Sequence, residues 1–186
     1  EIVLKKNDNY WGENKPKLAK IIVKGISDGN TLTLAMQSGE LDAVQGLPYA
    51  SLDLFQNKAE YQLSTADTSR IYQIAFNFKN PVLQDLRVRR AIAISIDKAG
   101  FAGLLLHGQG TPAKGPFPSS LPFGDSKRQA ATYDLAAAKN LLKEAGYVDS
   151  DGDGIVEKAG KPLKLRYLTY TSRQELPLLA EAVQAD

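Results

Sequence analysis

The sequence predicts an α/β fold, because short β-type runs alternate with amphipathic helical segments along the chain. Residues 20–23 read Lys-Ile-Ile-Val, an apolar run typical of a strand. A helical pattern follows over residues 31–38, with Asp28 able to cap its start and Gly39 suited to end it. The next run, 41–44, is again β-type. These segments together predict a strand-helix-strand unit.

The rest of the first half predicts a short strand, a short helix and one long β-prone stretch. Residues 2–4 predict a short strand, and residues 50–58 predict a short helix. Residues 61–78 form a long β-prone stretch in which apolar side chains alternate, which places them on one face of an extended segment. Asn80 and Pro81 are expected to end this stretch.

The strongest helical pattern covers residues 86–106, with Asp85 as its N-cap. Its apolar side chains recur at helical spacing and should be well buried; they are Val88, Ala91, Ile92, Ile96 and Ala99. Arg87, Arg89 and Arg90 lie near its start. We expect them to form a solvated face with a partner carboxylate, since cations are unfavourable at a helix N-terminus.

The second half begins with residues 107–125, which are rich in Gly and Pro and predict a defined loop. A helix is expected over 134–145, capped by its first residue, and a strand over 163–170. Ser172 and Glu175 match a capping box that would open a last helix.

Composition excludes several classes of function. The 186 residues suffice for one domain or two small ones, and the net charge is only +2 with bases and acids intermixed. We therefore expect no nucleic-acid partner. Cysteine is absent and His107 is the single histidine, so the sequence predicts no cofactor and no thiolate or histidine-rich metal site.

No motif predicts catalysis. His107 would need a serine nucleophile beside it for a triad, and the sequence contains no Gly-x-Ser-x-Gly elbow. A hydrolase is therefore disfavoured. Gly108 and Gly110 follow a predicted helix instead of opening one, which is the wrong context for phosphate binding. We predict that the protein is not an enzyme.

An acidic loop is the sharpest local signal. Asp149, Asp151 and Asp153, followed by Gly154, match the first half of a calcium-binding EF-hand loop. The twelfth position, where such loops use a bidentate Glu, is Gly160. We predict a metal-free acidic turn, with weak calcium binding as the alternative.

Five segments in collinear order resemble one family. The first reads Asn-Asp-Asn-Tyr-Trp-Gly at 7–12, similar to the family's Asn-Pro-x-Tyr-Trp with Asp8 in place of Pro. The second reads Gln-Ser-Gly-Glu-Leu-Asp at 37–42. The others are the Val-Arg-Arg-Ala helix ending in Asp-Lys at 88–98, Gly-Gln-Gly-Thr-Pro-Ala at 108–113, and Tyr-Asp to Glu-Ala-Gly-Tyr at 133–147. This pattern resembles the large solute-binding proteins of peptide, dipeptide and nickel ABC importers.

The resemblance implies part of a two-lobed periplasmic-binding-protein-like fold. Residues 1–77 would belong to the lobe that holds the chain ends, and residues 78–186 to the first part of the second lobe. The first residue is not Met, and the last helical pattern has no Gly or Pro terminator, so we expect an internal piece of a longer protein.

The resemblance also implies a function. The whole protein would capture oligopeptides, dipeptides or a nickel chelate outside the cytoplasm and deliver them to the membrane permease subunits, acting as a monomer. A periplasmic or extracellular location follows, with a lipid anchor left open. A non-transport sensing or structural module on the same fold is the alternative. Position beside the crossing strand makes Arg70, Tyr72 and Gln73 the candidate ligand-binding residues, and ordinary strand residues are the alternative reading for all three.

Overall fold

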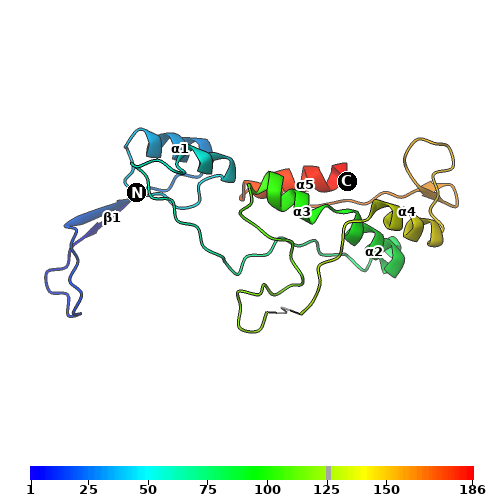
Figure 1. The fold of residues 1–186 in the computed structure, drawn as a ribbon, viewed down its shortest axis with the longest axis horizontal. Coiled ribbons are helices and arrows are strands. Elements are labelled where there is room, and N and C mark those ends of the chain that lie inside the picture. The colour runs from blue at the N-terminus through cyan, green and yellow to red at the C-terminus, as the bar shows by residue number, and fades with distance from the viewer. Residues whose placement is uncertain (125–126) are drawn as a thin grey trace. The chain divides into compact units, whose positions relative to one another are not determined.

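The computed structural model describes residues 1–124 and 127–186 and divides into two compact units, residues 1–51 and 52–186 (Figure 1). This division separates compact parts of the present chain. The assignment of residues 1–77 and 78–186 to different lobes concerns the larger two-lobed protein and stays a prediction. Asp125, the last residue of the predicted loop, lies outside the described residues.

The first unit contains a two-stranded ribbon and one helix. Strands β1 (Ile2–Lys5) and β2 (Lys20–Val23) pair antiparallel, with Ile2 opposite Val23. Both strands were predicted. Helix α1 (Gly29–Gln37) begins where Asp28 accepts the Thr31 amide at 2.7 Å, as expected for an N-cap.

The predicted strand at 41–44 is wrong. The amides of Glu40 and Leu41 both donate to the Ala35 carbonyl, at 3.0 and 3.3 Å, so the chain folds back on the end of α1 instead of extending from it. Gly39 makes this turn with φ near +75°, a conformation that glycine adopts without steric cost. The predicted helix at 50–58 is the 3-10 helix η1 (Tyr49–Leu54).

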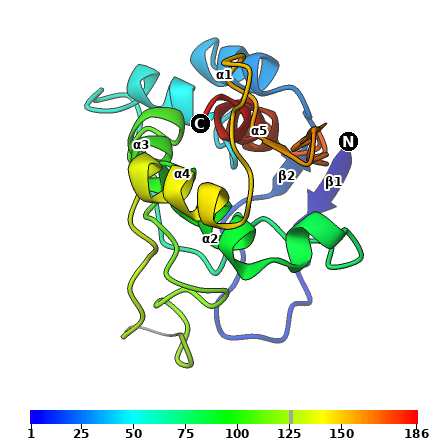
Figure 2. The ribbon, with the colours of Figure 1, turned by 90° about the vertical axis from the view of Figure 1, so that its right-hand side faces the viewer.

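The second unit is built around two packed helices. Helix α2 (Leu86–Ser95), which follows the 3-10 turn η2 (Pro81–Gln84), packs against α4 (Leu135–Glu144) (Figures 1 and 2). The core between and beside them consists of Leu83, Val88, Ala145 and Tyr147. The predicted inward face of α2 is therefore confirmed at Val88, which is fully buried.

The predicted helix over 86–106 is broken. Ile96 is extended, with φ near −90° and ψ near 118°, and the Asp97 carboxylate accepts the Gly100 amide at 2.9 Å. A new turn, α3 (Lys98–Gly100), starts there and continues as the π-helical turn η3 (Phe101–Leu105). The apolar spacing over residues 86–106 correctly predicted helical structure on both sides of the break. Aspartate is a strong N-cap residue, and Asp97 caps a second helix start.

Two predicted strands have no partner among the described residues. The stretches 61–78 and 163–170 run without strand pairing, apart from the Leu163 amide, which donates to the Val156 carbonyl at 2.8 Å. A β-prone sequence forms a strand only beside a second strand, so these predictions are wrong for the structure described. The hairpin of β3 (Glu157–Lys158) and β4 (Lys161–Pro162) stands just before the second stretch.

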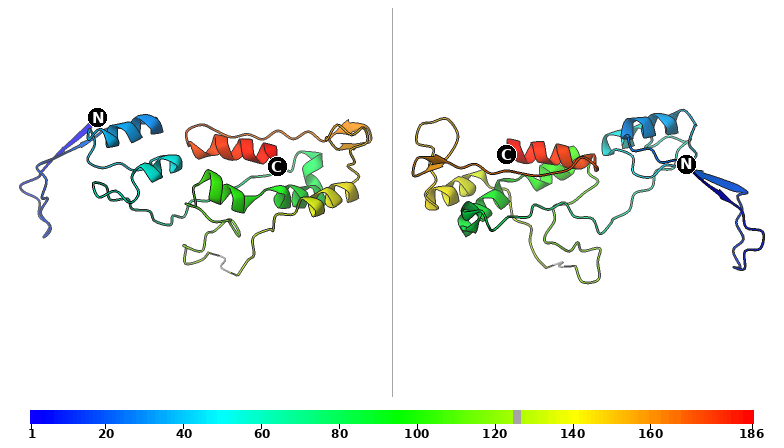
Figure 3. Two further views of the ribbon diagram at one scale, coloured as in Figure 1. Left: turned by 45° about the horizontal axis from the view of Figure 1, so that its top comes forward. Right: turned by 180° about the vertical axis from the view of Figure 1, so that it is seen from behind.

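Helix α5 (Glu175–Ala185) closes the unit and contacts the η3 turn (Figure 3). The predicted capping box is absent, because Gln174 is the N-cap residue and makes no side-chain capping bond. Glu175 is instead the first helical residue, and its side chain is engaged elsewhere. Within residues 1–124 and 127–186, no helix has the length and apolar character needed to span a membrane.

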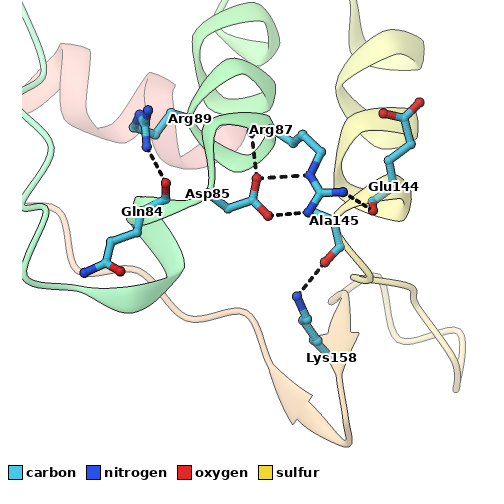
Figure 4. A network of polar contacts seen from close by, with 7 residues as sticks. All are labelled: Gln84, Asp85, Arg87, Arg89, Glu144, Ala145 and Lys158. Atoms are coloured by element: carbon cyan, nitrogen blue, oxygen red, sulfur yellow. Dashed lines mark hydrogen bonds and ion pairs between the residues drawn. The ribbon is translucent and has the colours of Figure 1, made fainter.

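A polar network joins the start of α2 to the end of α4 (Figure 4). The Asp85 carboxylate accepts the Arg87 amide at 2.9 Å and pairs with the Arg87 guanidinium at 2.7 Å. Arg87 also donates to the Glu144 carbonyl at 2.6 Å, while Lys158 donates to the Ala145 carbonyl at 2.7 Å. Two cations thus hold the negative end of α4.

The prediction for the three arginines near the start of α2 is therefore right in one respect and wrong in another. Asp85 is the partner carboxylate expected for Arg87. Arg89 is only half-exposed, because it donates to the carbonyls of Leu83 and Gln84, both at 2.8 Å, and lies over the Phe78 ring.

The hydrogen bonds from Arg87 lower the pKa of Asp85 from 3.8 to about 2. A carboxyl whose pKa is lower in the folded state stabilises the fold above its unfolded pKa, and this contribution disappears as the pH falls through the folded pKa. Asn still caps a helix but carries no charge, so replacing Asp85 by Asn should lower the melting temperature. Near neutral pH, the size of this decrease should not depend on the pH. The difference from wild type should shrink as the pH falls from about 4 to about 2.

Thermal unfolding followed by circular dichroism across this pH range checks the prediction. Asp42→Asn, a change at an exposed carboxylate, is the matched control and should show little effect at any pH. An Asp85→Asn deficit that stays the same from neutral pH down to about pH 2 would show that the charge of Asp85 contributes nothing.

Candidate functional site

Two of the three candidate ligand-binding residues converge on one carboxylate. The Tyr72 hydroxyl donates to Glu175 Oε1 at 2.8 Å, and the Arg70 guanidinium nitrogen Nη1 lies 3.6 Å from the same oxygen. Arg70, Tyr72 and Glu175 all belong to the second unit. The Glu175 side chain is 17% exposed and that of Arg70 is 45% exposed, so the carboxylate is the sheltered member and the guanidinium faces solvent.

Local hydrogen bonds hold the segment that carries Arg70. The Arg70 amide donates to Thr68 Oγ1 at 3.2 Å, which makes a tight turn just before the candidate residues. Ser120 Oγ, from the Gly- and Pro-rich loop, donates to the Thr68 carbonyl at 3.3 Å. The loop and α5 are thus both joined to the segment around Arg70 and Tyr72.

Gln73 does not join this cluster. Its side chain is exposed, and no hydrogen bond connects it to the residues that the structure describes. Glu175, in contrast, was missed as a site residue because its position suggested a capping box. It lies 103 residues from Tyr72, so no sequence spacing could have linked the two.

The side chains of the cluster carry the chemistry of polar recognition. A guanidinium donates hydrogen bonds in a planar fork that fits a carboxylate, and a phenol oxygen can both donate and accept. No serine-histidine pair lies within it. Among the described residues, the cluster therefore offers recognition chemistry.

The acidic loop is the one group of described residues that could hold a metal ion. Ligand oxygens of Asp149, Asp151, Asp153 and Glu157 all lie within 4.8 Å of one another. The same carboxylates close the turn: Asp149 accepts the Gly152 and Gly154 amides at 2.7 and 3.1 Å, and Asp153 accepts the Ile155 amide at 2.7 Å. Glu157 accepts from both the amide and the hydroxyl of Ser150, at 3.0 and 2.8 Å.

These hydrogen bonds give the acidic side chains a structural role in the turn. Gly152 and Gly154 both have positive φ, as turn residues commonly do. The prediction that the loop binds no metal remains a prediction, and a calcium titration tests it.

Millimolar calcium should leave the melting temperature unchanged within about one degree, because the loop lacks the bidentate glutamate that tight calcium loops use at their twelfth position. Differential scanning fluorimetry with and without a chelator measures this. Asp151→Ala is the diagnostic variant, and Asp53→Ala, at an exposed carboxylate outside the loop, is its control. A rise of several degrees with calcium that Asp151→Ala alone abolishes would establish a real site.

Comparisons with known proteins define first the class and then the family. Solved structures with the same fold are two-lobed periplasmic binding proteins, which confirms the predicted α/β class. The family model for bacterial extracellular solute-binding proteins, family 5, middle part, matches residues 1–186. The chain therefore belongs to the family 5 solute-binding proteins, as its sequence segments indicated.

Three relatives illustrate the similarity. The nickel-binding periplasmic protein of Escherichia coli K12 is 30% identical over 99% of this chain and 36% of its own length. The glutathione-binding protein GsiB of Salmonella paratyphi A is 28% identical over 93% of this chain and 34% of its own length. The structure of NikA from Brucella suis in complex with Fe(III)-EDTA superposes with a TM-score of 0.91 at 31% identity, covering 99% of this chain and 38% of that one. The chain thus spans little more than a third of the length of these relatives.

Proposed function

We propose that the protein carrying this chain captures a solute outside the cytoplasm and delivers it to the permease subunits of an ABC importer. The observation that carries the proposal is the family match over the whole chain, together with the close superposition on a solute-binding protein. We expect binding and release without catalysis. A periplasmic or extracellular location fits the family description. The lipid anchor stays an open alternative, which a mass measurement on the mature protein decides.

The proposed ligand is a small peptide or a nickel chelate. The relatives support both classes, since one binds nickel, one binds the tripeptide glutathione and one holds a metal chelate of EDTA. Glutathione and EDTA both carry carboxylates. A guanidinium is the side chain best suited to a carboxylate, so Arg70 is the proposed anchor, with Tyr72 beside it and Gln73 as an exposed amide next in the chain.

Import would depend on closure of two lobes around the ligand. In this proposal residues 1–77 belong to one lobe and residues 78–186 to the other, and the closed form docks on the permease. Ligand drives closure only through its higher affinity for the closed state. The candidate residues at 70–73 precede the proposed lobe boundary by a few positions, where a bound solute would meet both lobes.

Calorimetric titration of the protein at its full natural length tests the proposal. The panel is nickel(II) with L-histidine, nickel(II) alone, trialanine and glutathione, and we expect at least one of the carboxylate-bearing ligands to bind with micromolar affinity or better. The protein should elute as a monomer with and without ligand. A protein that binds none of the panel would contradict the proposal. Binding without any loss of solute uptake in a deletion strain would favour a sensing module over a transport component.

A further inference from the structure

We propose that the loop closing the β1–β2 ribbon of the first unit is a contact surface for an anionic lipid bilayer. This basic loop consists of residues 6–19 and the strand ends Lys5 and Lys20. It lies at the end of the ribbon that is remote from α1 (Figures 1 and 3). The inference concerns a partner of the protein other than its solute, so it goes beyond the proposed function.

Positive charge is concentrated in the basic loop. Residues 5–20 carry five lysines against Asp8 and Glu13, a net charge of +3, whereas all 186 residues together have a net charge of only +2. The rest of the chain is therefore slightly acidic. All five lysines are exposed. A basic cluster of this size attracts a surface of anionic lipid headgroups.

The register of the ribbon brings two of these lysines together. Lys5 lies opposite Lys20 in the last strand pair before the loop. Like charges directly opposite each other in an antiparallel pair are destabilising. An anionic group between the two ammonium groups would relieve this repulsion, so the pair favours a negatively charged partner.

The same charges keep the basic loop at the surface of the longer protein. Residues 2–4 and 21–23 read Ile-Val-Leu and Ile-Ile-Val, apolar on both faces, which is typical of strands that are covered on both sides. The rest of the protein is expected to cover these strands. Burying the lysines would require a partner for each of them, because an unpaired buried ammonium is very costly. The basic loop is therefore the part of the ribbon that stays in solvent.

An aromatic side chain projects from this charged surface. Trp11 is 90% exposed, and the Tyr10 ring lies beside it at a centroid distance of 5.6 Å. Lys15 donates to the Tyr10 carbonyl and so holds the backbone directly before Trp11. Leu18, later in the loop, is 63% exposed.

These residue types favour lipid over a protein partner. Tryptophan is enriched at membrane–water interfaces, where its ring lies at the level of the headgroups, and lysines beside it meet the anionic lipids. Protein–protein interfaces, in contrast, are depleted in lysine. A single lipid chain holds a protein at a bilayer only marginally, and a basic patch is a second signal that makes the attachment stable. The basic loop would supply that signal to a protein that delivers its solute at a membrane.

Sedimentation of the full-length, unlipidated protein with lipid vesicles tests the inference. Binding should be stronger to phosphatidylcholine vesicles with about a third phosphatidylglycerol than to phosphatidylcholine alone, and should weaken from about 0.05 to about 0.5 M sodium chloride. Lys5→Gln combined with Lys20→Gln should lower the partition coefficient about tenfold or more, and Trp11→Ala about fivefold. Lys161→Gln combined with Lys164→Gln, exposed lysines of the second unit, is the matched control for lost charge and should retain binding.

Three results would overturn the inference. The first is a wild-type protein that binds neither vesicle type or binds both equally, as it would if the loop met an acidic protein instead of lipid. The second is an equal loss of binding in the two double-lysine variants. The third is a Trp11→Ala protein that no longer folds, because the rest of the protein would then cover Trp11.

This test and the test of the proposed function fail separately. Solute binding in the calorimetric titration without vesicle binding leaves the proposed function standing and removes the lipid contact. Vesicle binding without solute binding contradicts the proposed function and supports the lipid contact.

Discussion

Replacing Val88 by Asp should abolish folding, and replacing it by Ala should lower the free energy of unfolding by about 1.5–3 kcal/mol. Val88 is 0% exposed and lies at the contact of α2 with α4, in one core cluster with Leu83, Ala145 and Tyr147. Truncation to Ala removes two buried methyl groups and leaves a cavity that the rigid helix pair fills only in part. An aspartate there would bury a charge without a partner, which costs several times more.

Denaturant unfolding of the full-length protein, followed by circular dichroism, measures both variants. Arg90→Ala, two positions further along α2 at an exposed site, is the matched control and should change stability by no more than about 0.5 kcal/mol. Equal effects of Val88→Ala and Arg90→Ala would contradict the placement of Val88 in the core.

Replacing Arg70 by Ala should weaken binding of the carboxylate-bearing solute by about tenfold or more, the value of a hydrogen bond to a charged group. Loss of the ion pair with Glu175 should by itself cost little stability, because the two charged groups lie 3.6 Å apart and the Arg70 side chain is 45% exposed. Arg70→Lys should recover part of the affinity, since an ammonium keeps the charge and loses the planar fork. Binding should also weaken with added salt in the wild type more than in Arg70→Ala.

Calorimetry at two ionic strengths, together with melting temperatures, separates these effects. Arg173→Ala, an exposed arginine just before α5, controls for the loss of one positive charge. If Arg70→Ala and Arg173→Ala bind the solute as tightly as wild type, Arg70 is an ordinary residue of the segment, which was the alternative reading of the sequence.

Local signals in the sequence predicted the start of three helices correctly. Asp28, Asp85 and Asp134 each accept a backbone amide of the first turn that follows, as an N-cap residue does. These interactions span two or three residues, so the sequence nearby is sufficient to identify them. The same rule explains why the helix predicted over 86–106 was too long, because Asp97 caps a second helix start within an unbroken apolar pattern.

Features that depend on distant residues could not be predicted in this way. The stretches 61–78 and 163–170 have strand-like sequences, but pairing requires a neighbour that no local pattern specifies. The contact of Tyr72 with Glu175 joins residues 103 positions apart, and the nearby Ser172 offered a local explanation for the glutamate that the structure does not bear out. The position of Arg70 and Tyr72 followed from resemblance, and their convergence on one carboxylate emerged only from the fold.

A structure of the full-length protein with its solute bound is the most direct test of the central claim, that this chain supplies part of a solute-binding site through Arg70 and Tyr72. We expect a carboxylate oxygen of the solute within hydrogen-bonding distance of the Arg70 guanidinium, and the Tyr72 side chain in contact with the same solute. A bound solute that contacts neither Arg70 nor Tyr72 would contradict the claim.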